Sequence, residues 1–98
     1  MSAMMIALNT TNPDEPEALK EYSQSAIALI RAAGGKPVGR YDFNEIVTGD
    51  NFPNVVLAVE FPSAGAIRTL FDSKEYKALI PLRDKGFKSF NVCICNAD

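Results

Sequence analysis

Hydrophobic side chains fill six of the seven positions from Val55 to Phe61, a pattern typical of a strand with both faces shielded from water. The Pro-Ser pair that follows ends this strand, and Ser63 is in position to cap a helix over residues 64–72. Ser73 is in position to cap a second short helix, which Pro81 is expected to end or kink. The middle of the chain therefore predicts a buried strand followed by two short helices.

Two further strands and a long helix are predicted before this stretch. Residues 4–8 form a short apolar run and residues 37–47 alternate polar with apolar side chains, so both are predicted as strands. Between them apolar side chains recur at helical spacing, with Asp14 in position to cap the helix and the glycine pair 34–35 to end it. The turn-forming residues 48–53 are a short connection, which predicts an antiparallel hairpin.

A last strand is predicted over residues 87–96, after a connector at 84–86. The complete order is then strand, helix, strand, strand, helix, strand. This order favours an α+β fold of the ferredoxin-like βαββαβ type, in which a four-stranded antiparallel sheet carries its helices on one face. At 98 residues, the whole chain 1–98 is expected to form a single domain.

The second face of the predicted sheet is also apolar. Val56 and Ala58 lie on it together with Cys93 and Cys95, and Glu60 adds the one charge of its strand. Because two helices cover only one face, a monomer should have a polar second face. The sequence therefore predicts a homodimer through this sheet face, with a monomer of mixed surface as the alternative. The two cysteines are predicted to be free, buried thiols.

Composition and charge exclude several classes of function. A net charge of −2 without a long basic stretch argues against nucleic-acid binding. No apolar run approaches the roughly 20 residues of a membrane helix, and the N-terminal residues lack the basic start of a signal peptide, so we expect a cytoplasmic protein. The chain has no histidine, no zinc-type cysteine spacing and no phosphate-binding glycine motif. No metal site and no cofactor are therefore predicted.

Four polar side chains are expected to converge on a cleft between the sheet and the helices: Arg40, Glu60, Tyr76 and Arg83. Two arginines and a tyrosine hydroxyl can hold a small anionic or phenolic ligand, and a half-buried Glu60 can move a proton. Each also has a structural interpretation. Glu60 can be a rim carboxylate paired with an arginine, Tyr76 a core residue, and Arg83 the partner of a carboxylate or of terminal carbonyls.

Asp72 and Ser73 form a further candidate pair. Their place between two predicted helices favours a helix junction with a capping serine over a catalytic pair. Tyr22 and Tyr41 are interpreted as packing residues.

A spaced set of residues between Glu60 and Arg83 resembles the family catalogued as domain of unknown function 1330, in the dimeric α/β-barrel superfamily. The set comprises Phe61-Pro62-Ser63, Phe71-Asp72-Ser73, Glu75-Tyr76, Leu79 and Arg83, and the likeness extends back through Gly34-Gly35, Arg40 and Gly49-Asp50. The resemblance implies a ferredoxin-like protomer whose sheet pairs with that of a second copy. Where family members commonly carry Gly-Gly and Trp-Tyr, this chain has Tyr41-Asp42 and Leu70-Phe71.

The resemblance also limits the functions to be considered. Relatives in the wider superfamily include cofactor-free monooxygenases of aromatic polyketides or quinols, chlorite dismutase-like haem proteins and small-molecule isomerases. Without histidine a haem role is not expected. We therefore expect a homodimer with a pocket for a small organic molecule, and cofactor-free oxidation or isomerisation is the activity that the resemblance implies.

In that interpretation Glu60 and Tyr76 are the candidate catalytic residues, and Arg40, Arg83, Asp72 and Ser73 the candidate ligand contacts. The alternative is a non-catalytic small-molecule-binding or regulatory dimer, in which the charged residues only brace the structure. The sequence leaves open whether the protein is an enzyme. An apolar cavity lined by Glu60 or Tyr76 favours the first interpretation.

Overall fold

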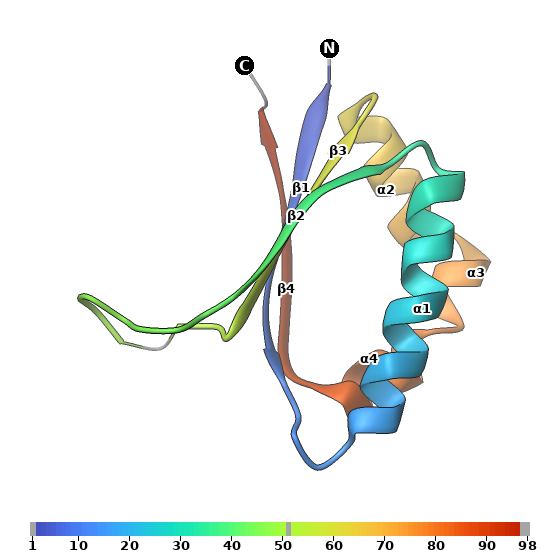
Figure 1. Cartoon of the computed structure of the whole chain (residues 1–98). Coiled ribbons are helices and arrows are strands. Elements are labelled where there is room, and N and C mark those ends of the chain that lie inside the picture. The colour runs from blue at the N-terminus through green and yellow to red at the C-terminus, as the bar shows by residue number, and fades with distance from the viewer. Residues whose placement is uncertain (1, 51, 97–98) are drawn as a thin grey trace.

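The computed structural model describes residues 2–50 and 52–96 of the chain. Its elements are β1 (Ala3–Thr11), α1 (Pro16–Ala32), β2 (Lys36–Asp42), β3 (Val55–Phe61), α2 (Ala64–Asp72), α3 (Lys74–Lys77), α4 (Ile80–Gly86) and β4 (Phe87–Asn96). The strands form one sheet in the order β2-β3-β1-β4, with antiparallel neighbours, and the helices cover one face of it (Figure 1). The predicted α+β, ferredoxin-like fold is confirmed.

The second strand is shorter than predicted. We expected it to run to Val47, but β2 ends at Asp42, which pairs with Val55 at the start of β3. Beyond Asp42 the alternation of the sequence continues without a partner strand, and the side chains of residues 43–50 are all exposed. The hairpin between β2 and β3 is antiparallel as predicted, whereas Asn51 in its connecting turn lies outside the described residues.

The beginning of α1 also differs from the prediction. Asp14 does not cap the helix; Glu15 is the capping residue, and its side chain makes no capping hydrogen bond. The backbone N–H of Asp14 instead donates to Oδ1 of Asn12, so a local turn precedes the helix. At its other end, Gly34 has a φ of 90°, the left-handed conformation that was expected to end the helix.

Pro81 begins a helix rather than ending one. It lies in the first turn of α4, where a missing backbone N–H costs nothing because that group would have no partner in the helix. The expected connector at 84–86 is consequently the last turn of α4. The two serine caps are confirmed: Ser63 Oγ accepts from the N–H of Ala66 at 3.1 Å, and Ser73 Oγ from that of Tyr76 at 3.1 Å.

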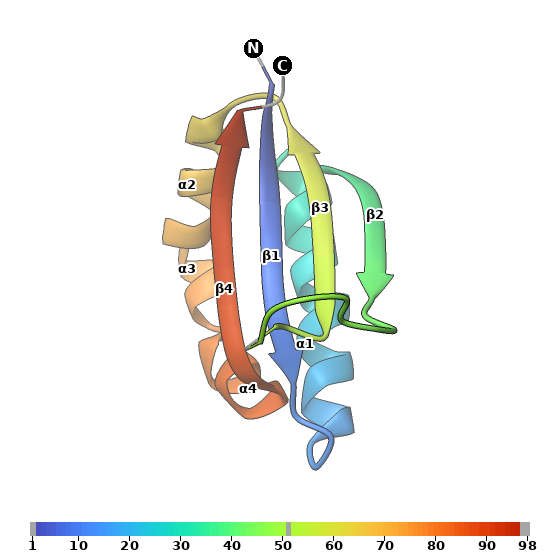
Figure 2. The ribbon, with the colours of Figure 1, turned by 90° about the vertical axis from the view of Figure 1, so that its left-hand side faces the viewer.

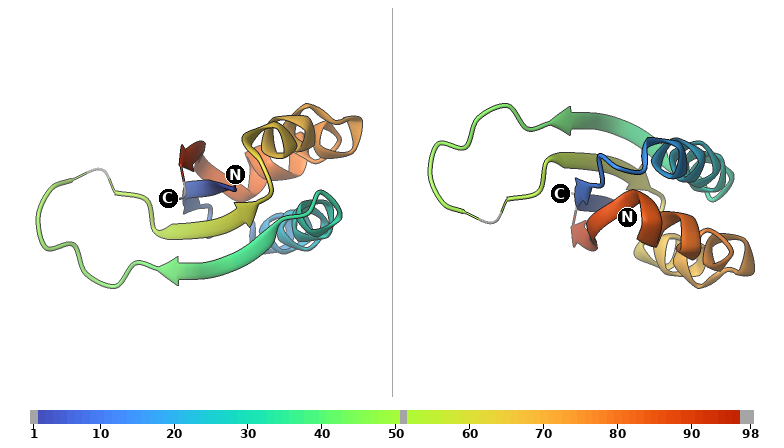
Figure 3. Two further views of the ribbon diagram at one scale, coloured as in Figure 1. Left: turned by 90° about the horizontal axis from the view of Figure 1, so that it is seen from above. Right: turned by 90° about the horizontal axis from the view of Figure 1, so that it is seen from below.

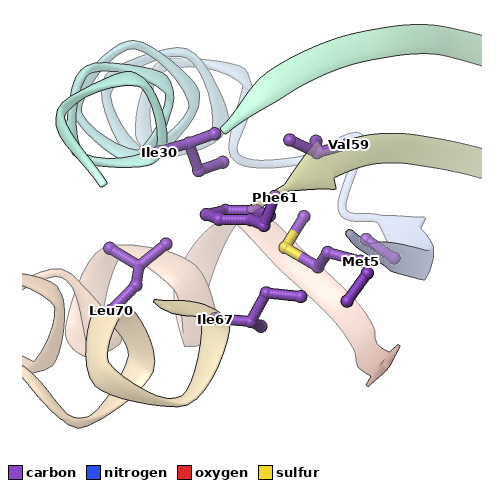
Figure 4. Packing of buried hydrophobic residues seen from close by; sticks show 8 residues of the cluster. Met5, Ile30, Val59, Phe61, Ile67 and Leu70 are labelled. Carbon is purple, nitrogen blue, oxygen red and sulfur yellow. The ribbon is translucent and has the colours of Figure 1, made fainter. Parts of the chain in front are cut away.

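The helix-covered face of the sheet holds the hydrophobic core. Met5, Val59, Phe61 and Ile67 are the largest side chains that are fully buried. Figure 4 shows the Phe61 ring between side chains of the sheet and of helices α1 and α2. Because Val59 and Phe61 both face the helices, the side chain of Glu60 between them points to the other face of the sheet.

The other face, which we call the open face, is apolar and has no helix on it (Figure 2). Its centre is formed by side chains at paired positions of three strands: Met4, Ile6 and Leu8 of β1, Val56 and Ala58 of β3, and Cys93 and Cys95 of β4. The two thiols are free, with their sulfur atoms 3.7 Å apart. They are exposed in the protomer, contrary to the predicted burial, because they lie on the face that no helix covers and on an edge strand. None of the helices in the described ranges is long and apolar enough to cross a membrane.

Helices α1 and α4 approach closely at Gly86, and this contact yields a stability prediction. A β-carbon on Gly86 would lie 2.9 Å from the Cα and backbone N of Leu19, so alanine there must push the helices apart. We expect Gly86→Ala to lower the free energy of unfolding by about 1–3 kcal/mol in urea denaturation. Gly65 in α2 is the matched control, because its nearest neighbour would be Ser63 Oγ at 3.7 Å. Gly65→Ala should be neutral or stabilising, and equal effects of the two substitutions would refute the prediction.

Candidate functional site

A cavity of about 280 Å³ lies between the sheet and the helices. The sheet lines it with Met5, Ala7, Leu57 and Val92 among others, and the helices line it with Tyr22, Ala26, Ile30, Leu70, Phe71 and Tyr76. Ala7 and Ala26 have short side chains where the neighbouring positions carry larger ones, which leaves room between α1 and β1. The volume is near the lower end of the roughly 300–1,000 Å³ typical of small-molecule sites.

Core residues close one end of this cavity. Ile30 and Leu70 belong both to the core cluster around Phe61 and to the cavity wall (Figure 4). A second cluster on the helix side contains Tyr22, Ala26 and Tyr76. The cavity is therefore bordered by both hydrophobic clusters.

Two tyrosine hydroxyls supply the main polar group of the cavity. Tyr22 and Tyr76 are both buried, and their hydroxyl oxygens are 2.8 Å apart. Tyr22 lies on the apolar face of α1, whereas the serine cap of α3 fixes the position of Tyr76. Two hydroxyls carry two protons, and the bond between them uses one. One O–H therefore remains to donate a hydrogen bond to a molecule in the cavity.

Arg83 supports this pair from α4. Its Nη1 donates to the Tyr76 hydroxyl oxygen at 3.3 Å, and its Nε donates to Oδ1 of Asp84 at 3.3 Å. Its guanidinium also lies 5.1 Å from the centre of the Phe90 ring, within cation–π range. Burial opposes its charge, but the hydrogen bonds to Tyr76 and Asp84 outweigh this and raise the pKa of Arg83. The arginine therefore stays charged and holds the Tyr76 oxygen in place.

Tyr22 is a neutral hydrogen-bonding group at physiological pH. Burial raises the pKa of Tyr22 well above its usual range, the hydrogen bond to Tyr76 raises it further, and the charge of Arg83 opposes the shift. This hydroxyl can orient a ligand but is a poor base. The described residues that line the cavity include no aspartate, glutamate or histidine.

Of the four side chains that were expected to converge, the structure brings two into contact and places a third on the cavity wall, while Arg83 itself does not line the cavity. Tyr76 and Arg83 are hydrogen-bonded, and Arg40 lines the cavity from β2. The Arg40 side chain is 57% exposed and forms an ion pair of 2.9 Å with Asp42, so it lies at the rim. Glu60 does not join them. It lies on the open face, opposite Met4, because the buried neighbours Val59 and Phe61 occupy the helix side of the strand.

Asp72 and Ser73 lie at the junction of α2 and α3. Ser73 Oγ donates to the carbonyl of Leu70 at 2.6 Å while it caps α3. The exposed Asp72 forms a surface ion pair of 3.4 Å with Lys77. Neither residue lines the cavity. The helix-junction interpretation is thus confirmed, and Ser73 affects the cavity only by positioning Tyr76.

Three residues that line the cavity were not predicted as site residues from the sequence. Tyr22 was interpreted as a packing residue, but it shares a hydrogen bond with Tyr76. Phe90 contacts the Arg83 guanidinium, and the buried Asn9 lines the cavity while its Oδ1 accepts from the backbone N–H of Asn91 at 3.0 Å. A tyrosine on the apolar face of a helix is a signal that a buried hydroxyl needs a partner, although the sequence does not show which residue supplies it.

Comparison with protein families gives one match over nearly the whole chain. The family model described as "Domain of unknown function (DUF1330)" matches residues 2–97. No curated protein matches the chain.

Several solved structures share the fold at low sequence identity. A protein of unknown function from Rhodopseudomonas palustris superposes with a TM-score of 0.84 at 20% identity, over 99% of this chain and 82% of that one. A dimeric protein of unknown function with a ferredoxin-like fold, from Bacteroides fragilis, gives 0.61 at 14% identity, over 98% and 96%. A "putative antibiotic biosynthesis monooxygenase" from Nitrosomonas europaea gives 0.67 at 13% identity, over 98% and 89%.

Proposed function

Because the chain belongs to the DUF1330 family, whose function is unknown, we propose its function from the cavity: it binds a small, largely apolar organic molecule that carries one hydrogen-bond acceptor. The observation that carries this proposal is the Tyr22–Tyr76 pair, which has one O–H left to donate inside an apolar enclosure. A ketone, a quinone or a phenolic oxygen meets this requirement. Arg40 at the rim can attract an anionic substituent.

We also propose that the protein is a cytoplasmic homodimer that forms through the open face. The support is the apolar character of that face, whose centre holds Met4, Ile6, Leu8, Val56 and Ala58 without a covering helix. A continuous apolar surface of this kind is typical of an interaction site. The Bacteroides fragilis protein, which shares the fold, is described as dimeric.

The binding proposal is tested with 1-indanone and indane, which differ only in the carbonyl group. We expect both to produce NMR shifts at cavity residues, with 1-indanone bound about five- to tenfold more tightly because its carbonyl accepts the spare tyrosine proton. In the double variant Tyr22→Phe with Tyr76→Phe this preference should disappear, whereas indane should bind as before. Removing both hydroxyls together leaves neither tyrosine oxygen without the other, and Arg83, which loses its bond to Tyr76, keeps its bond to Asp84, so the fold should be kept.

Tyr41→Phe is the matched control, because Tyr41 is 58% exposed on β2 and does not line the cavity. This variant should keep the full preference for the ketone. If neither compound shifts cavity resonances, or if the double variant keeps its preference for 1-indanone, the proposal is wrong.

The second candidate function is cofactor-free oxidation or isomerisation of the bound molecule, favoured by the shared fold with the Nitrosomonas europaea protein. Isomerisation next to a carbonyl requires a base, and Glu60 lies on the far side of the sheet from the tyrosines. The geometry therefore favours binding. Deuterium exchange at the α-carbon of 1-indanone in D₂O, followed by NMR, tests the isomerisation: acceleration by the protein would establish catalysis of proton transfer.

A further inference from the structure

The connection between β2 and β3 forms a projecting arm, which we define as residues 43–50 and 52–54. It leaves the sheet on the side opposite the helices (Figures 1 and 3) and crosses in front of one end of the open face (Figure 2). Four of its large apolar side chains are exposed: Phe43, Ile46, Val47 and Phe52, with Val47 at 91%. A long connection without regular structure is uncommon in a compact domain and usually has a function.

The base of the arm is held in a defined shape. The backbone N–H of Phe43 donates to the carbonyl of Asn54 at 2.9 Å, and the rings of Phe43 and Phe52 pack with their centres 5.9 Å apart. The apolar tip thus projects from an ordered base. A single protomer exposes this tip to water, which indicates that a second surface covers it.

A groove along the β4 edge of the molecule has the complementary character. Its floor includes Ile67 and Phe71 of α2 and Val92 and Ile94 of β4, and it also contains Arg68 and Arg83. The groove measures about 360 Å³. We call it the edge groove; it is distinct from the tyrosine cavity, although Phe71, Phe90 and Val92 line both.

The arm and the edge groove carry opposite charges. The arm contains Glu45 and Asp50 and no basic residue. The edge groove contains two arginines, of which Arg83 pairs with Asp84 and Arg68 makes no ion pair with any described residue. An apolar tip flanked by carboxylates matches an apolar groove bordered by a free guanidinium.

We propose that the arm of each protomer lies in the edge groove of its partner, within the homodimer proposed above, on which this inference rests. Two packed sheets lie about 10 Å apart, whereas the five residues from Phe43 to Val47 can extend over roughly 17 Å. An arm that starts at one sheet and points across the open face therefore reaches past the partner's sheet, to the level of its helices. The edge groove lies at that level, because α2 and β4 supply most of its lining.

This arrangement makes the tyrosine cavity depend on the dimer. Arg83 lies in the edge groove and also holds the Tyr76 hydroxyl at 3.3 Å. An arm in the groove excludes water from this guanidinium, which strengthens its hydrogen bond to Tyr76. Each protomer would thus complete the ligand site of the other.

Photo-cross-linking tests the arm directly. Val47 is replaced by p-benzoylphenylalanine, and ¹⁴N- and ¹⁵N-labelled protein are mixed so that mass spectrometry separates links within a chain from links between chains. We expect links between chains to peptides that contain Ile67 and Arg68 or Val92 and Ile94. The same photoreactive residue at the exposed Lys20 of α1 is the control and should give none of these links. Links within one chain, or links between chains to other surfaces, would overturn the proposal.

A charge exchange gives a second, independent readout. Arg68→Glu should lower the yield of the Val47 cross-link several-fold, and the additional changes Glu45→Lys and Asp50→Lys should restore it. A failure of the exchange to restore the yield counts against the proposed contact. Sedimentation separates the two proposals: a dimer whose links miss the edge groove refutes the arm contact alone, whereas a monomer refutes both.

Discussion

Replacing Ala58 with aspartate is expected to dissociate the proposed homodimer while the protomer stays folded. Ala58 lies at the centre of the open face, where it pairs with Ile6 of β1. In a dimer formed through this face, the twofold axis brings two new carboxylates into the interface. Burying an unpaired charge costs several kcal/mol, so we expect the dimer dissociation constant to rise by about a thousandfold or more.

The protomer should tolerate this change because the open face carries none of the core. The buried neighbours of Ala58 on its strand, including Val59, belong to the helix side, which the substitution leaves intact. Circular dichroism should therefore show an unchanged fold. Sedimentation velocity at several concentrations reports the change from dimer to monomer.

Ala28→Asp is the matched control, since the same substitution falls on an exposed position of α1, away from the sheet. It should leave the dimer intact. If the native protein is a monomer at high micromolar concentration, or if Ala58→Asp leaves it a dimer, the proposed interface is wrong.

Much of the fold was predictable because short-range sequence patterns determine it. The bounds predicted for β3 and β4 are those observed, because β3 is a nearly continuous apolar run, β4 carries regularly spaced apolar side chains, and turn or capping residues flank both. Ser63 and Ser73 were likewise found because a cap acts through neighbours only three residues away. Such short-range interactions can be predicted from a single sequence.

The errors come from positions where the outcome depends on distant contacts. Pro81 is compatible with the end of one helix and with the start of another. In the structure it lies in the first turn of α4, which packs on α1. Residues 43–47 alternate like a strand, but β3 supplies no partner beyond Val55. The sequence pattern could not show where the pairing ends.

The candidate site was only partly predictable for the same reason. Tyr76 and Arg83 were chosen for their chemistry, and the structure connects them by a hydrogen bond. Glu60 was expected beside them, although the two-residue period of β3 already places its side chain on the other face of the sheet from Val59 and Phe61. Tyr22 could not be linked to Tyr76 from the sequence, since the two residues lie 54 positions apart and meet only through tertiary packing.

Filling the cavity should abolish ligand binding without unfolding the protein. Ala26 on α1 lines the cavity and is 7% exposed, so a leucine at this position extends into the space that a ligand would occupy. We expect Ala26→Leu to weaken 1-indanone binding by at least about a hundredfold, as measured by NMR titration. Because the new methyl groups enter existing space, the free energy of unfolding should change by no more than about 1 kcal/mol.

Ala28→Leu separates this effect from a general effect of leucine on the helix. Ala28 is exposed two residues further along α1, and alanine and leucine have similar helix propensities. This control should bind 1-indanone as the native protein does. Full binding by Ala26→Leu would place the ligand outside the cavity, whereas loss of binding in both variants would show that helix α1, and not the filled volume, is responsible. Loss in Ala26→Leu alone would assign the ligand to the space beside the two tyrosine hydroxyls, the feature from which the function is inferred.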